Sequence, residues 1–286
     1  MIKRIYLLGI IIMLTVGVAM SDIHPGVALF NKADYNGAEA FFNKYLQQHP
    51  EHAEANYYMG RIKFIRENYN DAKDYLEIAI RKDPNNFLYY YWRGRSHLGL
   101  LMASNLIMKG VYASKTLNDF KTAVELNPDD LESRLYLAEY YGQAPGIAGG
   151  SASKAISQYR VAISKHPGVE YLYTGLGNQY RTIENYDSAM YYYQKAIDSD
   201  AGSATAHFEY GKTAVISGKQ LNLAEKSLLK ALSIGLTVNN QSEAYYYLGK
   251  LKESMDQTEH ARKNYQKSIQ LNEDNSEARK ALRKLK

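Results

Sequence analysis

The sequence predicts an all-α protein, a right-handed superhelical solenoid built of antiparallel helix pairs. Three observations lead to this fold class. Apolar residues recur at three- and four-residue spacing almost throughout the chain, and no alternating run is long enough for a strand. Short segments repeat along the chain and keep a small residue in the same place. Prolines recur at the points where one helix has to end before the next begins.

The composition is that of a folded protein, and it excludes several kinds of site. Hydrophobic residues make up 45% and charged residues 23% of the 286 residues, which is ordinary for a globular chain. The chain has no cysteine, so disulfides, thiolate zinc sites and a cysteine nucleophile are excluded. A formal net charge of +5 is too small to indicate a nucleic-acid partner. The unusual feature is the number of tyrosines, 27, against seven phenylalanines and one tryptophan, and the fold has to account for them.

The N-terminal segment, residues 1–21, has the layout of a secretory signal peptide. Two basic residues precede an apolar run over residues 5–18, and small residues follow. Such a run is shorter than the roughly 20 residues that a spanning helix needs, so an uncleaved anchor is the weaker alternative. We expect cleavage after Ala19 or after Ser21, and an exported bacterial protein that is periplasmic or secreted.

Three series of residues mark a repeated unit of two helices. A small residue recurs in the first helix, at Gly60, Gly94, Ala138, Gly177, Gly211 and Gly249. A second small residue recurs in the second helix, at Ala38, Ala72, Thr116, Ala155, Ala189, Ala224 and Ala261. One helical turn later come the larger residues Phe42, Leu76, Phe120, Tyr159, Tyr193, Leu228 and Tyr265. The small residues are expected where two helices cross closely, and many of the tyrosines are expected in the core.

This pattern resembles the tetratricopeptide repeat, in which such a helix pair ends in a proline and spans about 34 residues. We count seven copies in a solenoid over 22–286. They lie near residues 22–52, 53–86, 87–130, 131–169, 170–203, 204–241 and 242–274. The first copy has a shortened first helix, and the last three lack the closing proline. A charged helix over 275–286 is expected to cap the last copy.

A glycine-rich segment, residues 144–153, enlarges the fourth unit. Its sequence APGIAGGSAS suggests a phosphate loop, but no glycine precedes Lys154 and a helix rather than a strand leads into it. We therefore predict an enlarged turn and no nucleotide site. The segment is also similar to an APGIAGG-type loop of predicted exported bacterial tetratricopeptide repeat proteins, a resemblance that supports export. Positive φ angles are expected at Gly146, Gly149 and Gly150, and a helix cap at Ser151 or Ser153.

A second insertion, residues 99–115, enlarges the third unit. Its sequence GLLMASNLIMKGVYASK lengthens both helices and is rich in large apolar residues. One interpretation is a longer helix pair that buries its own apolar face. The other is an exposed tip that docks on a partner. The two interpretations differ in whether the tip is covered.

No motif for catalysis or metal binding appears in the sequence. The seven histidines are scattered without an HExxH pattern, and no GxSxG motif is found. We therefore expect no enzyme activity, no cofactor and no bound metal.

One pattern on the first helices is not explained by the packing of the repeats. In four units an aromatic residue stands four positions before a base, so that both lie on one side of the helix. The resemblance implies that this side faces a concave groove where partner segments bind. The pairs are Tyr57 and Arg61, Tyr91 and Arg95, Phe208 and Lys212, and Tyr246 and Lys250.

Two interpretations of these pairs stay open. In the first, each ring only shields the aliphatic stem of its own base. In the second, the groove receives an extended partner segment whose carboxylates meet the bases and whose other groups stack on the rings. The second predicts a non-catalytic scaffold for another protein of the cell envelope. The alternative function is a glycan-binding module of the envelope, in which the tyrosines stack on sugar rings. No nucleic-acid partner and no membrane span after signal cleavage are expected.

Overall fold

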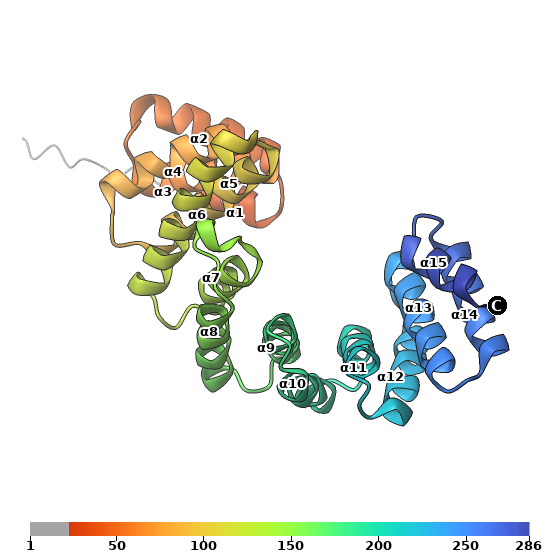
Figure 1. The fold of residues 1–286 in the computed structure, drawn as a ribbon. Helices are drawn as coiled ribbons and strands as arrows, with labels where there is room; N and C mark the ends of the chain where they lie inside the picture. Colours follow the sequence, from red (N-terminus) through yellow and green to blue (C-terminus); the bar gives the residue numbers. More distant parts are fainter. Residues whose placement is uncertain (1–22, 286) are drawn as a thin grey trace, which may run out of the picture. The chain divides into compact units, whose positions relative to one another are not determined.

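The structure is a computed structural model that describes residues 23–285, so the predicted signal peptide over 1–21 lies outside the described residues. Within residues 23–285 the chain forms fifteen α-helices and one 3₁₀ turn, and no strand (Figure 1). The predicted all-α fold class of antiparallel helix pairs is therefore confirmed. No helix in this part of the chain is long and apolar enough to cross a membrane.

The chain divides into two compact units, of which the first ends at Pro84 and the second begins at Asn85. The first unit contains two helix pairs around one small core. Phe42, Met59 and Ile62 are fully buried in this core. The helices are α1 (His24–Asn31), α2 (Tyr35–Gln48), α3 (Ala53–Ile65) and α4 (Tyr69–Lys82).

The second unit contains five helix pairs, a 3₁₀ turn η1 (Gly146–Ala148) and a final helix α15 (Ser276–Lys284). Each odd-numbered helix packs against the even-numbered helix that follows it, and α11 also contacts α9 and α13. Figure 1 shows α9, α11 and α13 along the inner side of the curve that this unit follows. The paired helices are α5 (Phe87–Ala103), α6 (Leu106–Leu126), α7 (Leu131–Gln143), α8 (Ala152–Lys165), α9 (Glu170–Thr182), α10 (Tyr186–Ser199), α11 (Ala204–Ser217), α12 (Leu221–Ile234), α13 (Val238–Ser254) and α14 (Thr258–Leu271).

Tight turns connect the helices of five pairs in the same way. In each turn one residue other than glycine has a left-handed φ between 53° and 59°, which reverses the chain within a few residues. Among the described residues the pairs α5·α6 and α7·α8 lack such a residue, because the two insertions take the place of the tight turn. The left-handed residues are Ala33, Glu67, Glu184, Gln220 and Asp256.

The small residues of the first helices lie where two helices cross. A Cβ atom on Gly60 would stand 2.7 Å from Cγ of Leu76, and one on Gly211 would stand 2.7 Å from Cγ of Leu228. The larger residue of the second helix therefore fills the space that the glycine leaves. The fully buried ring of Tyr193 fills the corresponding space beside Gly177 of α9. Burial raises the pKa of the Tyr193 hydroxyl to about 12.

Replacing Gly211 with alanine is expected to lower the free energy of unfolding by about 1–3 kcal/mol, because the added methyl group overpacks the crossing of α11 and α12. Urea denaturation measures this change. Gly110 is the matched control, because it is also helical but has no atom within 4 Å of the added Cβ. There, alanine is expected to stabilise the helix by about 0.5–1 kcal/mol. A loss at Gly110 as large as that at Gly211 would contradict the crossing argument.

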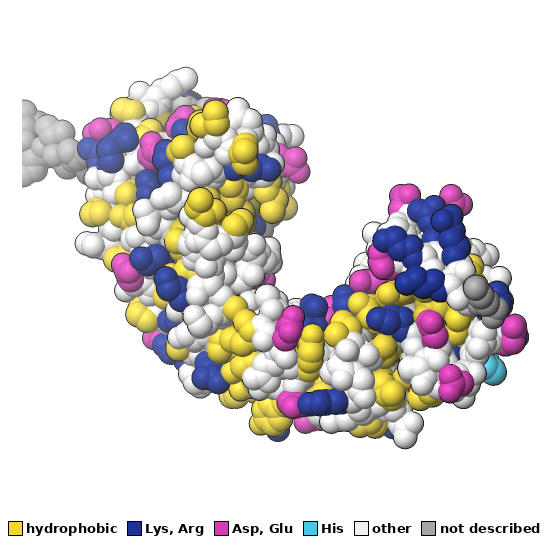
Figure 2. Space-filling model, viewed as in Figure 1, with side chains coloured by type: hydrophobic (Ala, Val, Ile, Leu, Met, Phe, Trp, Pro, Cys, Tyr) yellow, Lys and Arg dark blue, Asp and Glu magenta, His cyan; other side chains and the backbone are white. Residues whose placement is uncertain are grey.

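The last helix, α15, covers the end of the final helix pair. Ala278 is fully buried against that pair, and Asn275 caps α15 by accepting a hydrogen bond from the backbone N–H of Ala278. The opposite face is charged, and Figure 2 shows Lys and Arg side chains gathered over α15. The helix thus places a polar surface over the apolar end of the repeat array.

A chain shortened to end at Asn275 is expected to melt several degrees lower and to self-associate, because the apolar face beneath α15 becomes exposed. Differential scanning calorimetry and light scattering measure the two effects. The control is the full-length chain with Arg283 and Lys284 changed to glutamine, which keeps the cover and alters only exposed charge. An unchanged melting temperature and a monomeric shortened chain would show that α15 is not a cap.

Candidate functional site

The four predicted aromatic–base pairs all form in the structure. In each pair the charged group of the base lies over the ring that precedes it by one helical turn. The distances to the ring centroids are 5.4 Å for Arg61 over Tyr57, 5.5 Å for Arg95 over Tyr91, 5.3 Å for Lys212 over Phe208 and 5.9 Å for Lys250 over Tyr246.

Three of the four rings are buried. Tyr57 and Tyr91 are 6% exposed and Phe208 is 2% exposed, whereas Tyr246 is half-buried. Burial also raises the pKa of the Tyr91 hydroxyl, although Arg95 acts against this shift. The buried rings therefore offer almost no face on which a partner could stack. They act instead as supports that hold the bases in place.

Three of the bases gain support from rings on neighbouring helices; for Lys212 the ring is Tyr247 of α13, whose centroid lies 5.6 Å from Nζ. The guanidinium carbon of Arg61 lies 4.4 Å from the ring centroid of Phe30 on α1. That of Arg95 lies 4.3 Å from the ring centroid of Trp92 and 5.2 Å from that of Tyr136 on α7. Planar guanidinium groups stack well on aromatic rings, so each arginine is held in one orientation.

The two lysines differ in their electrostatic surroundings. Lys212 forms an ion pair with Glu243 of α13, with 3.2 Å between Nζ and Oε1, so part of its charge is already balanced. Lys250 is exposed and forms no ion pair among the described residues. A similar link, Arg181 to Glu209 at 3.5 Å, joins α9 to α11. The inner side of the second unit therefore combines internal ion pairs with an available base.

Three polar side chains, Arg93, His97 and Asp119, form a trio in the α5·α6 pair. Nη2 of Arg93 donates to Oδ1 of Asp119 at 2.6 Å, and Nδ1 of His97 lies 2.8 Å from Oδ2 of the same carboxylate. His97 and Asp119 are both buried. A His–Asp pair is a common catalytic element, but Nε2 of His97 is buried and has no hydrogen-bond partner among the described residues. The trio therefore joins the two long helices.

The family described as "Tetratricopeptide repeat" matches residues 29–93, 171–202 and 242–275. These matches fall on helix pairs with the small-residue crossings described above. These segments of the chain are tetratricopeptide repeats.

Solved structures of tetratricopeptide repeat proteins share the fold. The C-terminal part of a repeat-containing protein from Cytophaga hutchinsonii has a TM-score of 0.69 at 16% identity, over 91% of this chain and 99% of that one. A protein from Parabacteroides merdae has a TM-score of 0.62 at 16% identity, over 91% and 96% of the two chains. YrrB, described as having an unusual peptide-binding site, has a TM-score of 0.53 at 17% identity, over 73% and 97%.

A curated relative is tetratricopeptide repeat protein 37 of Xenopus laevis, which is 23% identical over 121 residues. The alignment covers 42% of this chain but 7% of the relative's length. At these identities the similarities show the repeat fold.

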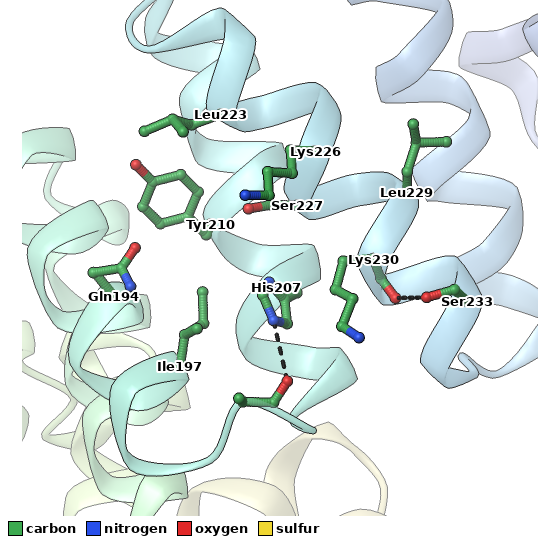
Figure 3. Close-up of a pocket in the computed structure, with 11 residues that line it drawn as sticks. Gln194, Ile197, His207, Tyr210, Leu223, Lys226, Ser227, Leu229, Lys230 and Ser233 are labelled. Carbon is green, nitrogen blue, oxygen red and sulfur yellow. Dashed lines mark hydrogen bonds between the residues drawn. The ribbon is translucent and has the colours of Figure 1, made fainter.

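The helix pairs of the second unit also form a pocket that the sequence did not indicate. It lies among α10, α11 and α12 and has a volume of about 610 Å³. Figure 3 shows Lys226 and Lys230 of α12 at this pocket, with His207 of α11 beside it. Nε2 of His207 lies 3.3 Å from the carbonyl oxygen of Ala201, and burial lowers the pKa of the ring.

The glycine loop of the fourth repeat is an ordered turn. Of the three glycines expected at positive φ, only Gly149 has one, at 88°. The expectation is wrong for Gly146 and Gly150; Gly150 is required for space, because a Cβ there would collide with the carbonyl oxygen of Ala144. Ser151, one of the two residues expected to cap α8, does so: its hydroxyl oxygen accepts a hydrogen bond from the backbone N–H of Lys154.

The tip of the third repeat is not covered. Leu106 is 86% exposed and Ile107 is 82% exposed, so the interpretation that this longer helix pair buries all of its own apolar face is wrong. The tip instead lies next to the glycine loop. The hydroxyl of Tyr140 on α7 lies 2.8 Å from the carbonyl oxygen of Ala113 on α6 and 2.9 Å from that of Ala148 in the loop. The two insertions lie in separate repeats, so the sequence pattern does not indicate this connection.

Among the described residues no group of three or more potential ligands is placed to hold a metal ion.

Proposed function

We propose that this chain is an exported, non-catalytic scaffold that binds an extended segment of another envelope protein along the first helices of its repeats. The observation that carries the proposal is the set of four bases held over aromatic rings, three of which are buried. Each base is positioned before a partner arrives, so little side-chain entropy is lost when a carboxylate binds. A surface selected only for solubility does not require aromatic rings beneath its basic side chains.

The second unit offers the clearest binding surface of this kind. Lys212 on α11 and Lys250 on α13 lie on neighbouring helices of its inner side, and Lys250 is exposed. An extended segment with two acidic groups fits this arrangement. The likeness to YrrB, which is described as a peptide-binding repeat protein, supports the same class of partner.

The burial of the rings argues against the glycan-binding alternative. Sugar rings stack on the open faces of aromatic side chains, whereas Tyr57 and Tyr91 are buried beneath their arginines. A protein segment needs only the charged groups and the backbone of the inner helices. The proposed partner is therefore a protein.

Site-specific photo-crosslinking in the native cell tests the proposed surface. The photoreactive residue benzoylphenylalanine replaces Lys250 on the inner helix α13 or, as the matched control, exposed Lys263 on the second helix α14. Mass spectrometry is expected to identify one discrete protein crosslinked from position 250 and absent from position 263. Equal crosslinking from the two positions, or none from 250, would contradict binding at the first helices.

Export predicts the N-terminus of the mature protein. Edman sequencing of the product isolated from its native cell is expected to begin at Met20 or at Asp22, because small residues follow the apolar run. A product that begins at Met1 would instead support an uncleaved anchor.

A further inference from the structure

The two insertions of the second unit together form a pocket. The end of α5, the start of α6 and the loop around η1 enclose a volume of about 830 Å³, next to α7. Leu101, Leu117 and Phe120 are among the apolar side chains that line it. Its size and lining are those of binding sites, and regular repeats of this chain have neither insertion.

Apolar surface extends beyond the pocket itself. Leu106 and Ile147 line the pocket and are almost fully exposed, on the α6 and loop sides respectively. Ile107 and Val111 continue this surface along α6 outside the pocket. A closed cavity for a small molecule does not need such a rim. A continuous apolar patch around a pocket is typical of a surface that binds another macromolecule.

One acidic side chain in the pocket lacks a partner. Glu139 of α7 is half-buried, and it forms no hydrogen bond or ion pair among the described residues. Burial, reinforced by the charge of Glu132, raises the pKa of its carboxyl group. Lys109 also lines the pocket, but it is exposed on α6 and does not pair with Glu139. A cation supplied by a ligand would balance this carboxylate in surroundings where charge is poorly screened.

We propose that this pocket binds a segment of a partner protein that carries Leu- or Phe-like side chains and one Lys or Arg, whose charged group reaches Glu139. The apolar side chains enter between α6 and the glycine loop. An anionic membrane surface fits less well, because Glu139 repels its headgroups. The pocket adjoins Arg95, because the Tyr136 ring that supports Arg95 also lines it. It differs from the first-helix bases in charge, because Glu139 selects a cation whereas the bases select carboxylates, so it adds a second specificity to the scaffold.

Selection from a displayed library of random twelve-residue peptides tests this proposal. Peptides that bind the full-length chain are kept only if they do not bind the Leu106→Asp/Ile147→Asp variant. Both substitutions lie at almost fully exposed positions, and circular dichroism checks that the fold is kept. The retained peptides are expected to combine two or more large apolar residues with a Lys or Arg.

The role of Glu139 is tested with one retained peptide and its Lys→Gln or Arg→Gln form. Glu139→Gln in the protein is expected to weaken peptide binding about tenfold. The change in the peptide is expected to have the same effect. If the two groups contact each other, both changes together are expected to weaken binding no more than either change alone. Lys212→Gln/Lys250→Gln is the matched variant of the first-helix surface. It is expected to leave this affinity unchanged, so failure here is distinguishable from failure of the proposed function.

Several outcomes would overturn the proposal. They are the absence of retained peptides, retained peptides without an excess of basic residues, and an affinity that does not depend on Glu139. Sedimentation with vesicles of three parts phosphatidylcholine to one part phosphatidylglycerol tests the membrane alternative. Vesicle binding that is lost in the Leu106→Asp/Ile147→Asp variant would assign the tip to a lipid surface instead.

Discussion

Replacing Asp119 with alanine is expected to lower the free energy of unfolding of the second unit by about 3–5 kcal/mol. The change leaves Arg93 and the buried His97 without the carboxylate that joins them. The polar groups of Arg93 and His97 would then lack this carboxylate as a hydrogen-bond partner in a poorly solvated region between α5 and α6, or water would have to enter this region. Either outcome destabilises the folded state. Urea denaturation followed by the fluorescence of Trp92, the single tryptophan, reports on this helix pair directly.

Asp187 provides the matched control, because the same substitution there breaks an exposed ion pair. Oδ1 of Asp187 lies 2.6 Å from Nζ of Lys219, and both side chains are more than half exposed. Alanine at this position is expected to cost less than about 1 kcal/mol. If the two substitutions cost the same, the trio of Arg93, His97 and Asp119 does not hold the long helix pair together.

Replacing Lys212 and Lys250 with glutamine is expected to weaken binding of the crosslinked partner segment about tenfold. Each change removes one attraction to a carboxylate and keeps the length of the side chain. Loss of Lys212 also frees Glu243, which then repels an acidic segment. Isothermal titration calorimetry with the partner peptide, at low and high salt, measures both the loss and the weaker salt dependence that follows from fewer charges.

Lys230 and Lys263 supply the control for the two inner lysines. They lie on α12 and α14, the second helices of the same two repeats, and both are exposed. The double glutamine variant at these positions makes the same change in net charge and is expected to bind the peptide as the unaltered protein does. An equal loss in both double variants would mean that net charge, rather than the first-helix surface, determines the affinity.

The fold could be predicted because local residues encode each repeat. Gly211 and Leu228 belong to one crossing, and the same small–large combination recurs at intervals of 34 to 44 residues along the chain. The side-chain caps, such as Asn185 before α10, mark helix starts in the same local manner. Because these interactions link residues within one repeat, they can be predicted from the local sequence without the rest of the fold.

The candidate binding residues could be predicted only in part. The spacing of Tyr91 and Arg95 requires them to meet on one helix face, and they do. The sequence did not show that the ring is buried, because burial depends on Tyr136 and the rest of the next helix pair. For the same reason it did not show that Lys212 is paired with Glu243, a residue of the following repeat.

The sequence alone determined that this chain is an all-α array of helix pairs, because periodicity, small residues and prolines act within one or two turns of helix. Only the tertiary structure decided that the insertions over 99–115 and 144–153 meet around Tyr140 and leave Glu139 unpaired beside an apolar pocket. Neither insertion follows the repeat pattern. Their contacts depend on the packing of two successive helix pairs, so no local spacing in the sequence could indicate them.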